Sequence, residues 1–187
     1  MTLRDLPNLI SALRILLVVP IVWLLLEERY GMALFLFAVA GISDGVDGYL
    51  AKRFQWITRL GSVLDPLADK LLMVSSYLAL GWLGHLPAWL VAVVIARDVV
   101  IVSGASFYHV AIEPVEMRPT LLSKINTVLQ IALILVVLVA QISSLPAATI
   151  TTLVYAVLAT TIGSGISYVW TWSCRARAAV RARRDSD

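Results

Sequence analysis

The sequence has one cysteine, few charges and no internal repeat. Cys174 is the single cysteine among 187 residues, which excludes an intrachain disulfide and a zinc site built from thiolates. Charged residues make up 14% of the chain and hydrophobic residues 60%, whereas a soluble domain is about a quarter charged. The mean hydropathy is +0.88. These values predict an all-α integral membrane protein and do not suggest a nucleic-acid partner.

Apolar stretches predict six transmembrane helices within a single membrane domain of residues 1–187. A helix needs about 20 apolar residues to cross a bilayer, and the expected helices cover about residues 8–26, 30–51, 60–83, 88–108, 121–140 and 147–172. The first run is not a cleavable signal, because it contains Arg14 and charges follow it. Pro7 suits the start of this helix, and Asn8 or Ser11 is expected to cap it.

Basic residues in the loops predict the orientation of these helices. One side receives Arg4, Lys52, Arg53, Arg59, Arg118, Lys124 and five arginines of the tail, residues 173–187. The other side receives Arg29. The positive-inside rule places the first side in the cytoplasm. We therefore expect a multi-pass protein of the inner (plasma) membrane with both termini cytoplasmic, and a disordered basic tail that marks topology or binds anionic lipids.

Four aspartates lie near the cytoplasmic ends of the second and third predicted helices. Asp44 and Asp47 are three residues apart, and Asp65 and Asp69 are four apart, so each pair shares one helix face. Carboxylates at membrane depth are costly and mark functional sites. Four neighbouring negative charges require cations, and oxygen ligands suit hard divalent ions. Mg²⁺, Mn²⁺ and Ca²⁺ are all such ions, and we predict that these aspartates, within the catalytic motif 44–69, hold two divalent cations, Mg²⁺ or Mn²⁺.

Small and basic residues lie among these acids. Gly45, Gly48 and Gly61 would let a ligand approach the helix backbone closely. Lys52, one turn after Gly48, supplies a cation for a phosphate or a nucleotide. Arg14 has two possible roles, which are contact with the nucleotide and neutralisation of an aspartate.

A long motif in this region resembles a family signature. The chain reads Asp44-x2-Asp47-Gly48-x2-Ala51-Lys52-x8-Gly61-x3-Asp65-x3-Asp69, which is similar to the signature of the CDP-alcohol phosphatidyltransferases. The departure is Lys52, where the family usually has arginine. The resemblance extends to Pro7-Asn8-x2-Ser11-x2-Arg14 and covers about residues 7–130. It implies a six-helix fold, usually a homodimer, that transfers a phosphatidyl group from CDP-diacylglycerol to an alcohol and releases CMP.

The resemblance also implies roles for individual residues. The four aspartates resemble the ligands of two divalent metals, and Asp69 also resembles the general base that takes the acceptor proton. Asp47, Gly48, Lys52 and Gly61 match positions that contact the cytidine nucleotide and its phosphates. The lipid chains would lie among membrane lipids, and the nucleotide would lie in a cavity that faces the cytoplasm.

Two stretches bear on the acceptor alcohol. The chain has no arginine between Arg97 and Arg118, where relatives that use glycerol 3-phosphate tend to have one, and a phosphomonoester needs such cations. Residues 118–127, RPTLLSKINT, are similar to relatives that form cardiolipin. Both stretches favour phosphatidylglycerol as acceptor, giving cardiolipin and CMP. The alternative acceptor is glycerol 3-phosphate, as in phosphatidylglycerophosphate synthases.

Two basic residues are candidates for contacts with the acceptor phosphate. They are Arg97 and Lys124. Arg97 could instead form a structural ion pair with Asp98, and Lys124 could instead extend to the lipid headgroups. A different class of function, a metal or ion transporter, would also place acids in the membrane. A transporter predicts broken helices and repeated halves, whereas these acids gather at one membrane face.

Overall fold

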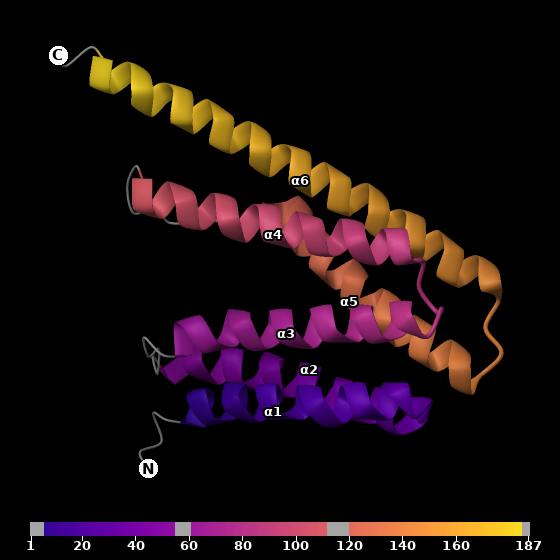
Figure 1. The fold of residues 1–187 in the computed structure, drawn as a ribbon. Coiled ribbons are helices and arrows are strands. Elements are labelled where there is room, and N and C mark those ends of the chain that lie inside the picture. Colours follow the sequence, from indigo (N-terminus) through magenta and orange to yellow (C-terminus); the bar gives the residue numbers. More distant parts are fainter. Residues whose placement is uncertain (1–5, 55–60, 112–119, 185–187) are drawn as a thin grey trace. The chain divides into compact units, whose positions relative to one another are not determined.

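The computed structural model describes the backbone of residues 6–54, 61–111 and 120–184, and the side chains of residues 9–45, 64–104 and 120–168. Within these ranges the chain forms six helices and no strand. They are α1 (Leu6–Leu26), α2 (Tyr30–Phe54), α3 (Gly61–Trp82), α4 (Ala88–Ala111), α5 (Leu121–Ile142) and α6 (Ala147–Arg184) (Figure 1). The predicted all-α fold class is confirmed.

Three of the described helices contain stretches long and apolar enough to cross a membrane. These stretches are Leu9–Leu26 of α1, Leu121–Ile142 of α5 and Ala147–Tyr168 of α6. The apolar part of α2, Tyr30–Gly45, is shorter, and α2 reaches 25 residues by continuing past the first aspartates. Backbone polar groups must be paired within the chain inside a bilayer, and this requirement favours helices in all these segments.

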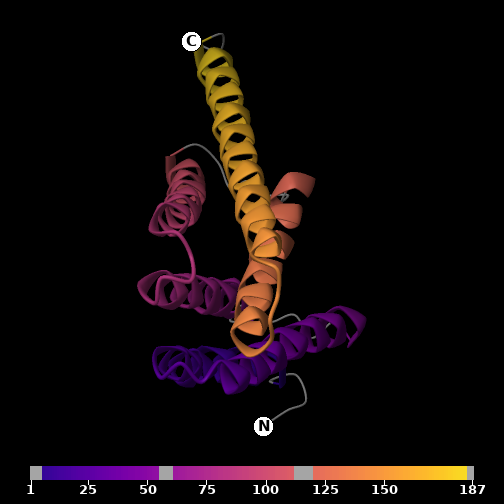
Figure 2. The same ribbon diagram turned by 90° about the vertical axis from the view of Figure 1, so that its right-hand side faces the viewer.

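Helix α6 is longer than the sequence analysis predicted. It extends over 38 residues to Arg184, and Figure 2 shows it as one unbroken ribbon from orange to yellow. The prediction that this helix ends near residue 172 was therefore wrong. The backbone of residues 173–184 is helical, whereas we expected it to be disordered. Alanine and arginine dominate residues 175–184, and both are strong helix formers. Basic charge marked this segment as a tail, but its composition also favours a helix.

The chain forms two compact units. The first contains α1, α2, α3 and residues 134–146, and the second contains α4 from residue 89, residues 121–133 of α5, and α6. In the first unit α1 packs against both α2 and α3 (Figure 1). Its buried side chains include Ile21, Leu25, Phe37, Leu72, Tyr77 and Leu80, while those of the second unit include Leu90, Val94, Leu133 and Val157. The single membrane domain stays a prediction.

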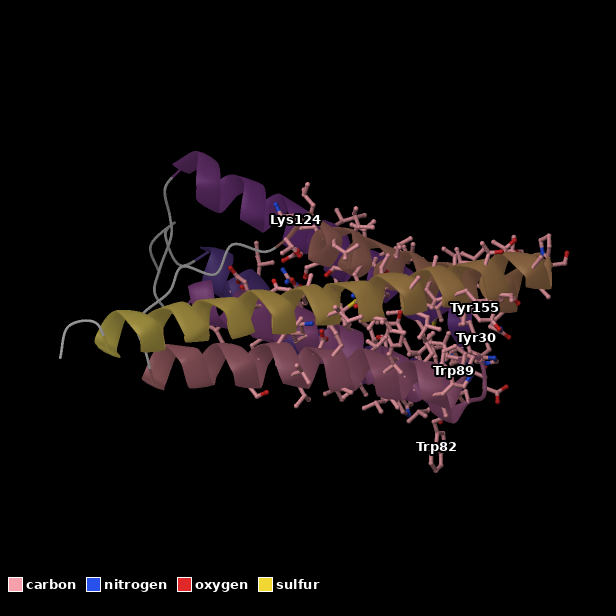
Figure 3. The ribbon with its side chains drawn as sticks, turned by 90° about the horizontal axis from the view of Figure 1, so that it is seen from above. Tyr30, Trp82, Trp89, Lys124 and Tyr155 are labelled. Atoms are coloured by element: carbon pink, nitrogen blue, oxygen red, sulfur yellow. The ribbon has the colours of Figure 1, made fainter. Side chains whose placement is uncertain are left out.

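The first unit has two tight turns at one end of its helices. Glu28 after α1 and Gly84 after α3 both have positive φ angles, 56° and 77°. The Tyr30 hydroxyl lies 2.7 Å from Nε2 of His85 and so connects the two turns. The imidazole of His85, in the turn after α3, is therefore paired with the first residue of α2. Trp82 is 85% exposed and projects away from the ribbon (Figure 3).

Candidate functional site

Three of the four predicted acidic residues contact side chains of α1. Asp44 lies on α2, and Asp65 and Asp69 lie near the start of α3. Nη1 of Arg14 lies 2.5 Å from Oδ1 of Asp44 and 2.6 Å from Oδ1 of Asp69. The hydroxyl of Ser11 donates a hydrogen bond to Oδ1 of Asp65. We call these five residues the acidic site.

Helical periodicity explains how α1 reaches both neighbouring helices. Ser11 and Arg14 are three residues apart, so they share one face of α1. That face packs against α2 and α3, and both side chains are buried. Apolar side chains occupy the outer face of the same helix, where Leu9, Leu13 and Leu16 are exposed. The apolar exterior suits a lipid environment, and the polar interior is reserved for the carboxylates.

Arg14 is buried, whereas the two carboxylates that it contacts are partly exposed. The Arg14 side chain is 1% exposed, whereas those of Asp44 and Asp69 are 40% and 51% exposed. Their two Oδ1 atoms lie within about 5 Å of each other, because each is within 2.6 Å of the same nitrogen. A buried guanidinium needs a counter-charge, and two carboxylates that close need a cation. Of the two roles considered for Arg14, the contacts support neutralisation of the aspartates.

The role of Ser11 differs from the sequence expectation. We predicted that it could cap the first helix, but α1 begins at Leu6, which places Ser11 in the second turn. At that position its hydroxyl is directed to Asp65 on another helix. The short capping pattern was therefore misleading, since the partner comes from a residue 54 positions later in the chain.

Several predicted nucleotide-site residues lie outside the described side chains. Asp47, Gly48 and Lys52 lie on α2, and Gly61 begins α3, but their side-chain surroundings are outside the described part of the chain. Their roles stay predictions. Gly45 is described, and a Cβ atom placed there would meet no atom within 4 Å among the described residues. None of the described residues therefore covers the surface of α2 at Gly45.

The donor chemistry of the acidic site fits a hard divalent cation. Carboxylate oxygens are the ligands that Mg²⁺ and Mn²⁺ prefer, and here they come from two adjacent helices. Among the described residues, no three Asp, Glu, His or Cys side chains form a group that could hold a metal ion. Asp47, the fourth predicted ligand, is outside that set. Metal binding by Asp44, Asp47, Asp65 and Asp69 therefore stays a prediction.

Arg97 is buried in the second unit and forms hydrogen bonds with side chains of α4, α5 and α6. Its Nη1 donates to Oδ1 of Asp98 at 2.7 Å, its Nη2 to the hydroxyl of Ser123 at 2.7 Å, and its Nε to that of Ser164 at 3.1 Å. The side chains of Arg97 and Asp98 are 7% and 9% exposed. These contacts connect α4 to α5 and α6, as a structural pair would. Contact of Arg97 with an acceptor phosphate stays a prediction.

Residues of α5 contribute one exposed cation and one buried amide. Lys124 is exposed near the start of α5 (Figure 3), and its contact with an acceptor phosphate stays a prediction. Oδ1 of Asn126 accepts hydrogen bonds from the hydroxyls of Thr160 at 2.9 Å and Thr161 at 2.8 Å on α6. The sequence analysis missed this connection. The available signal was the presence of polar residues inside two apolar spans, where they need partners.

The helices and the acidic site together define an α-helical membrane protein with a charged site between packed helices. Residues 4–163 match the family model described as CDP-alcohol phosphatidyltransferase. The chain belongs to the CDP-alcohol phosphatidyltransferase family.

Three relatives illustrate the range of similarity. The chain is 34% identical to the cardiolipin synthase (CMP-forming) of Rattus norvegicus over 146 residues, which cover 68% of this chain and 48% of the relative. It is 36% identical to the cardiolipin synthase (CMP-forming) / mitochondrial hydrolase fusion protein of Schizosaccharomyces pombe over 179 residues, covering 87% and 30%. It is 32% identical to the chloroplastic CDP-diacylglycerol–glycerol-3-phosphate 3-phosphatidyltransferase 1 of Oryza sativa over 183 residues, covering 88% and 56%. The chain thus spans about half the length of these relatives or less.

Proposed function

We propose that this protein transfers a phosphatidyl group from CDP-diacylglycerol to phosphatidylglycerol, giving cardiolipin and CMP. The observation that carries the proposal is the convergence of Asp44, Asp65 and Asp69 on one face of α1, in a chain of this family. The similarity to the rat and fission-yeast cardiolipin synthases supports this choice of reaction.

The reaction exchanges a phosphoanhydride bond for a phosphoester bond. An acceptor hydroxyl oxygen bonds to the phosphorus that carries the diacylglycerol, and the bond from that phosphorus to the CMP oxygen breaks. The electron pair of the broken bond leaves with CMP, and the hydroxyl proton passes to a base. We assign the base role to Asp69, whose side chain is 51% exposed and is thus accessible to an incoming hydroxyl. A positioned carboxylate of this kind typically accelerates a reaction by about 10²–10⁴-fold.

Two divalent cations, Mg²⁺ or Mn²⁺, belong to the proposal, with Asp44, Asp47, Asp65 and Asp69 as the residues that would hold them. When bound, such cations neutralise charge on the pyrophosphate and on the departing CMP. We assign Asp47 and the residues Gly48, Lys52 and Gly61 to binding of the nucleotide. Because no described residue covers Gly45, the nucleotide could approach the backbone of α2 there.

The polar contacts of the second unit support an acceptor with little charge. The guanidinium of Arg97 already bonds to Asp98, Ser123 and Ser164, so its positive charge is partly compensated. The exposed Lys124 supplies one cation for the acceptor phosphate. A phosphodiester such as phosphatidylglycerol carries one negative charge and needs less compensation than a phosphomonoester. Glycerol 3-phosphate is the second candidate acceptor, and the similarity to the rice enzyme favours it.

The proposal includes a homodimer in the inner (plasma) membrane, with the acidic site and both termini facing the cytoplasm. The distribution of loop arginines and lysines supports the orientation, whereas the homodimer is the state that the family resemblance implies. The single cysteine allows a direct test of topology, because a membrane-impermeant thiol reagent can react only at Cys174. Labelling in inside-out vesicles but not in intact cells is expected, and the reverse pattern would contradict the orientation.

The reaction is tested with the purified full chain, CDP-diacylglycerol and Mn²⁺. Phosphatidylglycerol and glycerol 3-phosphate are supplied in separate reactions, CMP is measured, and the lipid product is identified by mass spectrometry. We expect CMP and cardiolipin with phosphatidylglycerol. If product forms with glycerol 3-phosphate but not with phosphatidylglycerol, the proposed acceptor is wrong. If chelator-treated enzyme keeps full turnover, the proposed requirement for divalent cations is wrong. If neither acceptor yields CMP, the transferase proposal fails, and ion flux into protein-containing vesicles would then support a transporter.

A further inference from the structure

The acidic site already contains one positive charge of its own. The guanidinium of Arg14 is buried on the inner face of α1 and contacts carboxylates from α2 and from α3. Divalent cations would account for the aspartates, but they give no reason for a buried arginine between them. Ser11, on the same face and equally buried, holds the third carboxylate. Helix α1 therefore contacts all three described aspartates of the site.

We propose that Arg14 is the built-in counter-ion of the acidic site, and that Arg14 and Ser11 together hold the carboxylates in place before any metal binds. The inference deepens the proposed function and rests on its metal-binding part. Arg14 is a positioning residue in this proposal and takes no part in bond making or bond breaking.

The contacts allow the arginine and a metal to be present together. Arg14 and Ser11 use the Oδ1 atoms of Asp44, Asp69 and Asp65. Each carboxylate has a second oxygen that these three contacts do not use. A carboxylate held through one oxygen loses rotational freedom before a cation arrives, which lowers the entropy lost on binding. Helix α1 thus orients the ligands without displacing the cation.

The charge of Arg14 also has a cost for metal binding. A guanidinium beside the carboxylates repels an incoming divalent cation, and Coulomb repulsion between charges in contact in a partly buried site exceeds the gain from ordering one side chain. Arg14 should therefore stabilise the metal-free protein and weaken its affinity for the cation. A metal-free membrane protein with several uncompensated carboxylates between its helices would be unstable.

The test compares thermal unfolding of variants of the full chain in detergent micelles, with EDTA or with increasing Mn²⁺. The six tryptophans provide an intrinsic fluorescence signal. We expect Arg14→Met to lower Tm in EDTA by about 5–10 °C, since a broken partly buried ion pair destabilises the fold. Saturating Mn²⁺ should raise Tm more in this variant than in the wild type. Isothermal titration should show Mn²⁺ binding tighter by about tenfold, because the repelling charge is gone.

Two control variants separate charge from structure. Arg29→Met removes the same charge from an exposed residue of the same unit, in the turn beyond the end of α1, which lies about 18 Å along the helix from Arg14. It should change neither Tm in EDTA nor the Mn²⁺ response. Arg14→Lys retains the charge and should recover most of the Tm lost in Arg14→Met, with Mn²⁺ affinity near that of the wild type.

The possible outcomes distinguish the two proposals. If Mn²⁺ fails to shift the Tm of the wild type, metal binding by the site is refuted. If the wild type responds and Arg14→Met responds equally, the counter-ion role is refuted. Should Arg14→Met not fold, the pair Arg14→Met/Asp44→Asn is used. If the second substitution, which removes the charge of Asp44, restores folded protein, the counter-ion role of Arg14 is supported. If it does not, that role is contradicted.

Discussion

Replacement of Arg97 by methionine should destabilise the protein strongly. Arg97 and Asp98 are both nearly buried, and the arginine also donates to Ser123 on α5 and Ser164 on α6. The variant Arg97→Met leaves the Asp98 carboxylate without its arginine inside the second unit. Removing one partner of a buried ion pair typically costs about 3–5 kcal/mol. Each kcal/mol lowers Tm by about 2–4 °C in a chain of this size, so the expected loss is on the order of 10 °C.

The double variant Arg97→Met/Asp98→Leu is the informative comparison. It removes both charges and fills the space with apolar side chains, so neither an uncompensated carboxylate nor an uncompensated guanidinium remains. Replacement of a whole buried pair is often neutral or stabilising. The two serine hydroxyls lose a partner in both variants, and membrane-protein hydrogen bonds contribute about 0.6 kcal/mol on average. The double variant should therefore recover most of the Tm lost by the single variant.

Thermal unfolding is measured by tryptophan fluorescence in detergent, and acceptor dependence is measured in parallel by CMP release. CMP release is compared at a temperature where both variants are folded, so that a loss of activity does not simply report unfolding. If Arg97→Met retained the wild-type Tm and raised only the KM for the acceptor, Arg97 would be an acceptor ligand and the structural reasoning would be refuted.

Three further substitutions test other parts of the molecule. Asp69→Asn should lower CMP release by about 10²–10⁴-fold, because the proposed base is lost, and it should lower Tm less than Arg14→Met does, because Asp44 still compensates Arg14; a variant that retains full turnover would exclude Asp69 as the base. Asn126→Leu should lower Tm through loss of about 1–2 kcal/mol, whereas Thr151→Val, which removes an exposed hydroxyl bonded to its own helix, should not; equal effects would contradict a stabilising role of the bonds between Asn126 and α6. Tyr30→Phe removes the bond to His85 and should cost about 0.5–1.5 kcal/mol; His85→Ala should then lower Tm less in the Tyr30→Phe variant than in the wild type, and equal losses in the two backgrounds would contradict the bond.

The positions of the helices could be predicted from the sequence because hydropathy and span length are local properties. The predicted segments agree with α1 to α5 to within a few residues at each end. The error at the end of α6 arose because charge was weighted above helix propensity. Helical spacing also predicted that Asp65 and Asp69 share a face of α3, since a spacing of four residues has that result in any α-helix.

The partners of the polar residues were less accessible to sequence reasoning. Arg14 had two possible roles, and Ser11 was expected to cap a helix, although its hydroxyl bonds to Asp65 on α3. The imidazole of His85 contacts Tyr30, a pairing that the sequence did not indicate. In each case the partner lies more than 50 residues away in the chain. No local pattern can specify such a pairing.

The sequence by itself determined that this is a helical membrane protein with a costly group of carboxylates near the ends of two helices, because apolar length and charge burial follow from composition and order. Only the tertiary structure decided that α1 contributes a buried cation and a hydroxyl to those carboxylates. The packing of α1 against α2 and α3 selects which of its faces is enclosed, and that choice depends on contacts between distant residues.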